Sequence, residues 1–313
     1  MKVIYDVLKI NKKFINPVLA IGVFDGLHLG HRYLISKVIR RAKSIEGTSI
    51  VMTFFPHPSH VLSPKLNLPL LISLKERLNL IEVMGVDICL VVNFTRRFSK
   101  LDPYYFVKKY ILKHVAPREV FIGHDFRFGR NREGDFNFLK KFSQTNNFKV
   151  YEIPAVKNKG LVVSSTLIRK FIAAGNLIKA RQLLGRNIFV SGKVKRGDHR
   201  GRLLGFPTAN MDVSSQVIVP LGVYIIRVIM NGKIYKGMAN VGFRPSFEKE
   251  KKLTVEAHIF RFNQSIYGQM ITIEFLNKIR EEKRFKTKND LISQLQKDKQ
   301  QALLLFSKKF SSR

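Results

Sequence analysis

The chain has 313 residues, of which 45% are hydrophobic and 25% charged, a balance that excludes a disordered chain and allows two domains with separate cores. Its 56 lysine and arginine residues against 22 acidic residues give a formal net charge of +34. Because the basic residues are spread along the whole chain, they indicate a solvated surface and exclude a concentrated nucleic-acid-binding tail.

The sequence gives no sign of membrane insertion or export. No apolar run approaches the ~18 residues that a membrane span needs, and the N-terminus has no signal-peptide pattern. The one cysteine, Cys89, lies in the apolar stretch 86–92, where it is expected to pack in a core without a disulfide. We therefore expect a cytoplasmic protein with neither a membrane partner nor a specific nucleic-acid partner, and the sequence leaves its oligomeric state open.

Strand and helix patterns alternate from the N-terminus to about Gly185. The expected strands are Val18–Val23, Ser49–Phe54, Asp87–Val92, Glu119–Ile122 and Lys149–Glu152, and the expected helices are His31–Ser44, Leu74–Met84 and Pro103–His114. This order predicts an α/β fold with a doubly wound parallel sheet, in which ligands bind at the carboxyl ends of the strands.

The segment after the first of these strands contains the motif His28-Leu29-Gly30-His31. Its two histidines are three residues apart, which places both imidazoles on one side of the first helical turn. Gly26 and Gly30 allow backbone N–H groups to approach an anion, and the helix start provides a positive end. The pattern predicts a site that binds phosphate and stabilises charge developing at phosphorus. A helix cap or a core histidine is the alternative for either imidazole.

Three further segments of the first half also contain polar groups at a strand end or a helix start. They are His57 in the turn 53–58, Asp125 and Arg127 in the run 123–129, and Ser165, Thr166 and Arg169 in the run 164–169. Hydroxyls at a helix start with an arginine one turn later suit a triphosphate. A structural turn at His57 and a plain N-cap at Ser165 are the alternatives.

Beyond Gly185 the sequence changes to short, β-branched strands. They are expected at Ile188–Val194, Val223–Met230, Ile234–Asn240, Leu253–Phe260 and Met270–Leu276. Asn231-Gly232 predicts a type I′ hairpin turn, and a terminal helix is expected from about Lys288. We predict a small antiparallel β-barrel with a C-terminal helix, preceded by two short helices that end at Gly175 and Gly185. The expected domains are residues 1–185 and 186–313.

Taken together, the motifs of the first half resemble the N-terminal adenylyltransferase module of prokaryotic bifunctional riboflavin kinase/FAD synthetases. The second half resembles the riboflavin kinase signature at Gly192-x-Val194, Gly197, Gly201-Arg202-Leu203-Leu204-Gly205-Phe206-Pro207-Thr208-Ala209-Asn210, Gly222-Val223-Tyr224, Ala239-Asn240-Val241-Gly242-x-Arg244-Pro245, Val255-Glu256-x-His258, Tyr267-Gly268 and Ile279-Arg280-x-Glu282-x-x-Phe285. The resemblance runs in unbroken order from about Leu19 to Asp298.

For the second domain the resemblance implies phosphorylation of riboflavin. The 5′-hydroxyl of the ribityl chain would attack the γ-phosphate of ATP and give FMN and ADP. Glu256 is expected to act as the general base. Thr208 and Asn210 are expected to bind Mg²⁺ and the nucleotide phosphates, Thr208 through its hydroxyl.

For the first domain the resemblance implies adenylylation of FMN, in which the FMN phosphate attacks the α-phosphate of a second ATP and releases pyrophosphate. His28 and His31 are expected to stabilise the transition state. The expected ATP contacts are Gly26, Gly30, Ser165, Thr166 and Arg169, and the expected flavin contacts are His57, Asp125 and Arg127.

Three other function classes explain less of the sequence. Another His-x-Gly-His nucleotidyltransferase, for pantetheine phosphate or glycerol phosphate, would explain the first half alone. An aminoacyl-tRNA synthetase fits worse, because no Lys-Met-Ser-Lys-Ser-like loop is present. A basic RNA-binding module on a degenerate nucleotide fold is the alternative outside enzymes. The absence of a Gly-x₄-Gly-Lys-Ser/Thr motif argues against a P-loop kinase.

Overall fold

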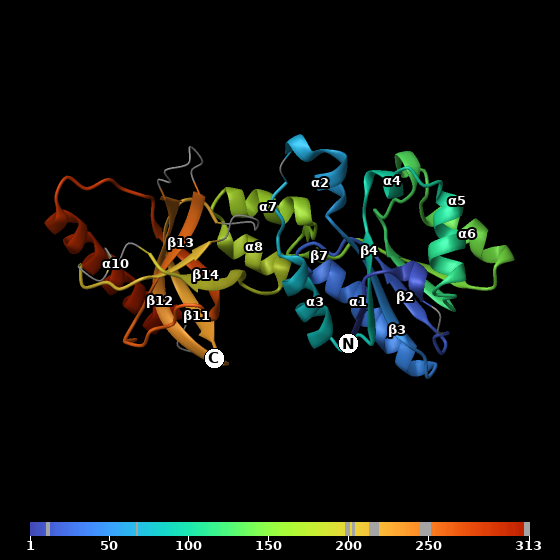
Figure 1. Ribbon diagram of the computed structural model, residues 1–313, viewed down its shortest axis with the longest axis horizontal. Coiled ribbons are helices and arrows are strands. Elements are labelled where there is room, and N and C mark those ends of the chain that lie inside the picture. Colours follow the sequence, from blue (N-terminus) through green and yellow to red (C-terminus); the bar gives the residue numbers. More distant parts are fainter. Residues whose placement is uncertain are drawn as a thin grey trace. The chain divides into compact units, whose positions relative to one another are not determined.

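The computed structural model describes residues 1–10, 13–66, 68–197, 201, 204–212, 219–244 and 252–309. Arg202, Leu203 and Pro245 of the riboflavin kinase-like motifs lie outside this part of the chain. The chain divides into two compact units, Met1–Ser165 and Thr166–Arg313 (Figure 1). The predicted boundary after Gly185 lies two short helices later than this division. The second of these helices packs on strands of the second unit and is therefore grouped with it.

The first unit is built on a parallel six-stranded sheet. Its strands are β1 (Lys2–Ile4), β2 (Val18–Ile21), β3 (Ser49–Phe55), β4 (Ile88–Asn93), β5 (Glu119–Gly123) and β6 (Lys149–Ile153), in the order β1-β4-β3-β2-β5-β6. The doubly wound sheet predicted from the sequence is confirmed. The edge strand β1 was not predicted, because three residues are too few to show a strand period.

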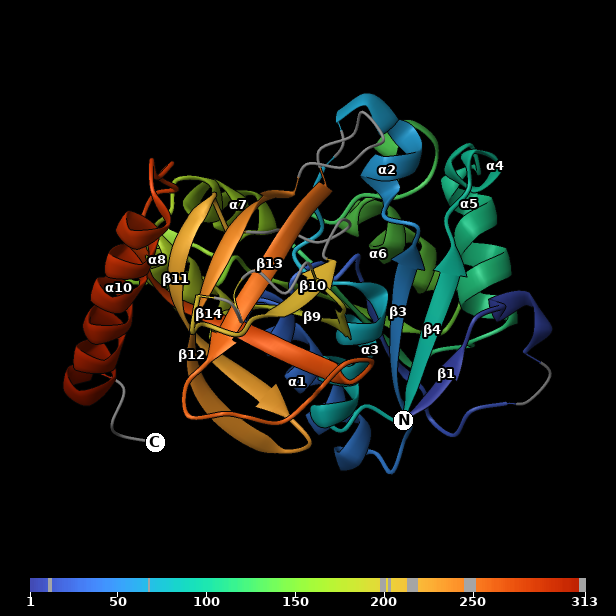
Figure 2. The same ribbon diagram turned by 60° about the vertical axis from the view of Figure 1, so that its left-hand side comes forward.

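Helices flank both faces of this sheet. The α-helices between the strands of this unit are α1 (Leu29–Ser44), α2 (Pro58–Leu62), α3 (Leu74–Val83), α4 (Arg96–Ser99), α5 (Pro103–Phe106) and α6 (Phe136–Thr145). In Figure 2, α1 and α3 lie on one side of β3 and β4, and α5 lies on the other. The helix predicted over 103–114 becomes π-helical over Val107–Lys113. A small hairpin of β7 (Lys157–Asn158) and β8 (Leu161–Val162) follows β6.

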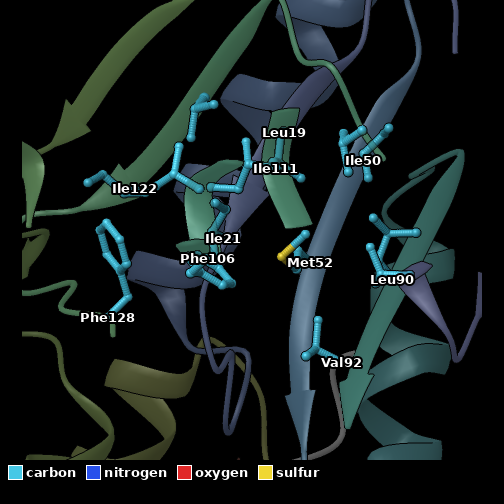
Figure 3. Packing of buried hydrophobic residues seen from close by; sticks show 14 of the residues in the cluster. Leu19, Ile21, Ile50, Met52, Leu90, Val92, Phe106, Ile111, Ile122 and Phe128 are labelled. Carbon is cyan, nitrogen blue, oxygen red and sulfur yellow. The ribbon is translucent and has the colours of Figure 1, made fainter. Parts of the chain in front are cut away.

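One face of the sheet packs against α5, and the residues between them form an apolar core. Alternate residues of the strands, such as Leu19 and Ile21 of β2 and Ile50 and Met52 of β3, point to this face, as expected for a period of two (Figure 3). Phe106 of α5 packs against them. The residues between them, Ala20 and Val51, are also buried, because α1 packs on β2, β3 and β5 from the opposite side. Cys89 of β4 is fully buried as well. Cys89 is thus the core residue predicted, and burial raises the pKa of its thiol to about 12.

The strand order reverses between the neighbouring strands β2 and β5. From β2 the chain continues to β3 and β4 on one side of the sheet, and from β5 it continues to β6 on the other side. In open α/β sheets the carboxyl ends of the strands on either side of such a reversal form a ligand-binding crevice. The His-x-Gly-His segment follows β2 at this point. The topology therefore places the predicted phosphate site where this fold class binds ligands.

The second unit is a closed antiparallel barrel. Its strands are β9 (Ile188–Lys195), β10 (Ala209–Asp212), β11 (Gly222–Met230), β12 (Lys233–Arg244), β13 (Lys252–Ile259) and β14 (Met270–Arg280), in the order β10-β13-β12-β11-β14-β9. Asn231 (φ 48°) and Gly232 (φ 73°) form the predicted hairpin turn between β11 and β12. The barrel prediction is confirmed, but β10, which closes the barrel between β9 and β13, was missed.

Helices α7 (Ser165–Ala173) and α8 (Leu177–Leu184) precede the barrel, and α10 (Lys288–Lys309) follows it. Gly185 ends α8 in a left-handed conformation, as predicted. Figure 2 shows α10 along the outside of the barrel, where Ala302 and Phe306 pack against Phe206 and Phe260. Among the described residues, no helix has the length and apolar character needed to cross a membrane.

Two candidate active sites

His28 caps helix α1 through its own ring. Its backbone is extended (φ −70°, ψ 175°), and its Nδ1 accepts a hydrogen bond of 3.3 Å from the backbone N–H of His31. A neutral imidazole that accepts at Nδ1 carries its proton on Nε2. The capping role, which the sequence left as an alternative to phosphate binding, therefore fixes the tautomer that offers Nε2–H as a donor.

The ring of His31 lies flat against that of His28. The two centroids are 3.6 Å apart with an interplanar angle of 18°, and the edge of Phe24 contacts His31 from another side. Burial lowers the pKa of His31 well below 6.5, and the nearby His28 and Arg77 lower it further. His31 is therefore neutral at pH 7. Its buried Nδ1 has no hydrogen-bond partner within the described part of the protein.

The two glycines of this turn are needed for packing. Gly26 has a φ of +79°, and a Cβ there would stand 2.5 Å from Cδ1 of Leu71. At Gly30 a Cβ would stand 3.3 Å from Nδ1 and Cε1 of His28. A side chain at either position would displace a neighbour that shapes the turn. Glycine at position 30 thus allows the His28 ring to fold over the start of α1.

Ser165, which the sequence placed on the triphosphate, lies against the same turn. Its hydroxyl donates a 2.9 Å hydrogen bond to the carbonyl of Asp25, so the structure brings the start of α7 together with the turn after β2. Asp25 is itself buried, and its carboxylate accepts from the backbone N–H of Leu71. Thr166 and Arg169 follow Ser165 on α7 and belong to the second compact unit.

The other sequence-predicted residues of the first unit follow strands beside β2. His57 comes after β3 and caps α2, its Nδ1 accepting from the N–H of Ser59 at 3.1 Å, so the structural turn weighed as its alternative is present. Asp125 and Arg127 come after β5 and are exposed. Because β3 and β5 are the two neighbours of β2, all three segments lie at the carboxyl edge of adjacent strands.

Arg77 is a functional candidate that the sequence analysis missed. It is fully buried, and its Nη1 donates to the carbonyl of Val23 (2.8 Å), to Oγ1 of Thr53 (3.0 Å) and to the carbonyl of Phe54 (3.2 Å). Burial lowers the pKa of this guanidinium, and the nearby Asp25 opposes that effect. Arg77 thus links the ends of β2 and β3 through hydrogen bonds near the turn that contains His28 and His31. An arginine on an amphipathic helix gives no sequence signal of such burial.

The second site is a cavity of about 470 Å³ in the barrel unit. Thr208 and Asn210 line it together with apolar residues of β9, β10 and β13 and with the segment 262–267. Two glycines give these polar side chains their space. A Cβ at Gly197 would collide with the Asn210 amide, and a Cβ at Gly201 would collide with the carbonyl of Phe206 and approach Oγ1 of Thr208. The structure thus brings the predicted pair Thr208 and Asn210 together.

Glu256 lies on β13 beside this cavity. It is the register partner of Asn210 on β10 and of Asn240 on β12, so the three side chains share one face of the barrel wall. Ala257, the next residue, lines the cavity. Asn240 was not singled out from the sequence as a site residue, because only the strand pairing brings it beside Glu256.

Among the residues that the structure describes, no group of three or more histidine, cysteine, aspartate or glutamate residues could hold a metal ion. The polar donors at the barrel cavity are instead the hydroxyl and amide groups of Thr208 and Asn210. Such oxygen donors fit a hard divalent cation held chiefly by substrate phosphates.

The stacked histidines at the reversal point of the doubly wound sheet and the barrel cavity lined by Thr208 and Asn210 both offer polar groups that suit nucleotide phosphates. Comparison with known proteins specifies the class of protein. The family model described as FAD synthetase matches residues 10–167, and the model described as riboflavin kinase matches residues 184–306. The chain belongs to the bifunctional riboflavin kinase/FMN adenylyltransferase family.

Individual relatives cover nearly the whole chain. The bifunctional riboflavin kinase/FMN adenylyltransferase of Listeria monocytogenes is 38% identical over 94% of both chains, and that of Bacillus subtilis is 36% identical over 93% of this chain and 92% of its own. A solved structure from Streptococcus pneumoniae, described as a macrolide-efflux protein, has a TM-score of 0.85 and 30% identity over 95% of this chain and 97% of its own.

The expected function is confirmed at the level of the family. This chain is a flavin-cofactor biosynthesis enzyme whose N-terminal part makes FAD from FMN and whose C-terminal part makes FMN from riboflavin. Both reactions consume ATP, and the family generally needs a divalent metal. Riboflavin, FMN and ATP are thus the substrates that the family implies.

Proposed function

We propose that His28 and His31 carry out the adenylyl transfer in the first unit, and that Glu256, Thr208 and Asn210 carry out the phosphoryl transfer in the second. The observation that carries the first assignment is the hydrogen bond from the His31 N–H to Nδ1 of His28, since it leaves His28 with an Nε2–H donor at the reversal point of the sheet.

In the adenylyl transfer, a phosphate oxygen of FMN attacks the α-phosphorus of ATP. The new bond joins this oxygen to the α-phosphorus, and the bond between the α-phosphorus and the oxygen bridging to the β-phosphate breaks, so that pyrophosphate leaves. The nucleophile is already an anion, so no general base is required. His28 donates Nε2–H to the phosphates, and His31 stabilises the charge of the transition state.

The remaining residues of the first site bind the substrates. Backbone N–H groups around Gly26 and Gly30 and the side chains of Ser165, Thr166 and Arg169 hold the triphosphate. His57, Asp125 and Arg127 contact the flavin. The positions of His57 and Asp125 after the two strands that flank β2 support this assignment.

In the phosphoryl transfer, the 5′-hydroxyl of riboflavin gives its proton to the Glu256 carboxylate and attacks the γ-phosphorus of ATP. The bond from the γ-phosphorus to the bridging oxygen breaks, and ADP leaves. Thr208 and Asn210 hold the nucleotide phosphates and Mg²⁺, which when bound neutralises phosphate charge. The register pairing of Glu256 with Asn210 supports a shared site.

The same proposal extends to the organisation of the chain. The functional boundary lies at Gly185–Arg186, and the enzyme acts in the cytoplasm without a specific nucleic-acid or membrane partner. The boundary agrees with the start of the riboflavin kinase match at residue 184. We do not propose efflux for this chain, because both family models and the curated relatives describe flavin chemistry over the same residues.

A reciprocal pair of variants tests these assignments. His31→Ala should lower FAD formation from supplied FMN by about 10²–10³-fold and leave riboflavin phosphorylation unchanged. Glu256→Gln keeps the side-chain shape, and it should lower FMN formation by roughly 10²-fold while FAD formation from FMN persists. Flavins are resolved by chromatography after incubation with Mg-ATP. Unchanged FAD formation in the first variant, or unchanged FMN formation in the second, would remove that residue from the mechanism.

A further inference from the structure

His258 is a buried histidine that the mechanism above does not use. It lies two residues after Glu256 on β13 and is 8% exposed. Its Nδ1 is 2.9 Å from the carbonyl oxygen of Pro207. A carbonyl oxygen can only accept, so the Nδ1 of His258 must carry the proton. Burial lowers the pKa of this imidazole, with Lys299 acting in the same direction and the Pro207 bond against it, so the ring is neutral at pH 7.

Aromatic neighbours hold the ring of His258 in place. The centroids of Phe206 and Phe260 lie 5.2 and 5.7 Å from it, both in edge-to-face arrangements. These two phenylalanines belong to the apolar cluster that includes Ala302 and Phe306 of α10. The imidazole is therefore fixed to the packed wall of the barrel, and its Nδ1–H has one direction in which to donate.

The hydrogen bond from His258 to Pro207 also restrains the next residue, Thr208. The carbonyl of Pro207 and the N–H of Thr208 belong to one planar peptide unit, so a hydrogen bond to the carbonyl fixes the plane from which Thr208 starts. On the other side of Pro207, the N–H of Phe206 donates to the carbonyl of Gly201 at 2.8 Å. The segment is thus held on both sides of Pro207, and its next residue lines the cavity.

We propose that His258 is a positioning residue for riboflavin phosphorylation, whose Nδ1–H holds the Pro207–Thr208 peptide so that the Thr208 hydroxyl faces the nucleotide phosphates. This inference rests on the proposed function of Thr208. It assigns to the His258 ring a directional role beyond filling space between Phe206 and Phe260.

Three substitutions in the full chain distinguish the hydrogen bond that His258 donates from the packing of its ring. The amide nitrogen of Asn coincides with Nδ1 of histidine, whereas the longer Gln places its amide at the position of Nε2. His258→Asn thus retains the donor to Pro207, and His258→Gln and His258→Leu lose it. The measurements are KM for Mg-ATP and kcat of riboflavin phosphorylation, with urea unfolding of the same preparations as the control for a folded barrel.

We expect His258→Leu and His258→Gln to raise KM for Mg-ATP by about tenfold, the usual effect of losing one buried hydrogen bond, and His258→Asn to stay within about threefold of wild type. KM for riboflavin should change little in all three. If the Leu variant does not fold, the comparison of Asn with Gln decides alone. Equal KM for Mg-ATP in the Asn and Gln variants, or a wild-type value in a folded Leu variant, would overturn the proposal.

Thr208→Val, measured in parallel, distinguishes this inference from the proposed function. A wild-type KM for Mg-ATP in Thr208→Val would refute the role of Thr208 itself. A raised KM in Thr208→Val together with equal values for the Asn and Gln variants would leave Thr208 in the site and refute only the role of His258.

Discussion

Single hydrogen bonds decide what the histidines of this enzyme can donate. His28 accepts at Nδ1 from a backbone N–H, so its Nε2 carries the proton. His258 faces a carbonyl with its Nδ1 and therefore carries the proton on the opposite nitrogen. Residue type alone does not reveal this difference, since either ring nitrogen of a neutral imidazole can carry the proton.

The lowered pKa of His31 predicts how stability depends on pH. As the pH falls below 6.5, the imidazole of the unfolded chain takes up a proton before that of the folded chain. The free energy of unfolding should therefore fall with decreasing pH between 6.5 and the lower folded-state pKa, by at most about 1.4 kcal/mol per pH unit from this residue. Urea unfolding at pH 7, 6 and 5 should show a shallower loss for His31→Gln. Identical pH slopes for the two proteins would contradict the prediction.

Removal of the Arg77 guanidinium should destabilise the first unit. Arg77→Met leaves three acceptors at the ends of β2 and β3 without their shared donor and Asp25 without a nearby cation, at a cost of about 3 kcal/mol. Arg77→Lys should cost less, because an ammonium can keep part of these bonds. Urea unfolding provides the measurement, and Lys75→Met, an exposed position on the same helix, is the matched control. Equal stability of Arg77→Met and the control would show that the buried bonds contribute nothing.

At the scale of elements, the shortest segments carry most of the site. The four-residue strand β10 closes the barrel and contains Asn210, and the turn formed by residues 204–208 leads directly into it. Helix α1 is long and regular, but only its first turn contains the histidines. The long strands and helices act as the rigid frame to which these short pieces are attached.

The packing of this turn makes Gly201 a sensitive position. In Gly201→Ala the added methyl group would collide with the backbone carbonyl of Phe206, which cannot rotate away, so Gly201 or residues 204–208 must shift. We expect KM for Mg-ATP in riboflavin phosphorylation to rise by about tenfold. FAD formation from FMN, a reaction of the other unit, should be unchanged in the same preparation. A wild-type KM for Mg-ATP would show that the turn can relax without moving Thr208.

For the whole molecule, the main property is that each compact unit has its own core. The apolar cluster behind the parallel sheet and the cluster under α10 share no residue. Each unit also corresponds to a different family model. Two reactions at different phosphorus atoms of ATP are thus carried by two separately packed folds.

This independence predicts the behaviour of fragments. Fragments 166–313 and 186–313 should both phosphorylate riboflavin and make no FAD. The longer fragment should be more stable by about 3 kcal/mol, because α8 buries Leu183 and Leu184 and packs on β9 and β14. Chromatography of flavins and urea unfolding measure the two properties. A folded fragment 166–313 that lacks kinase activity would show that the barrel needs the first unit for its reaction.

The parts of this protein with a local signal could be predicted from the sequence. The buried strands around Val18–Ile21 and Ser49–Phe55, the His-x-Gly-His segment, the Asn231-Gly232 turn and the ordered kinase motifs could all be identified, because apolar period, capping residues and turn residues act over a few neighbouring positions.

Which of these segments meet, and which polar groups are buried, depends on the folded chain and could not be predicted. β1 and β10 are too short to show a period, and they are strands only because β4, β9 and β13 offer hydrogen bonds to them. Arg77 is buried because distant carbonyls accept from it, and Asn240 lies beside Glu256 because of strand register. Such contacts join residues far apart in the chain, so their energies depend on the whole fold and leave no pattern in the local sequence.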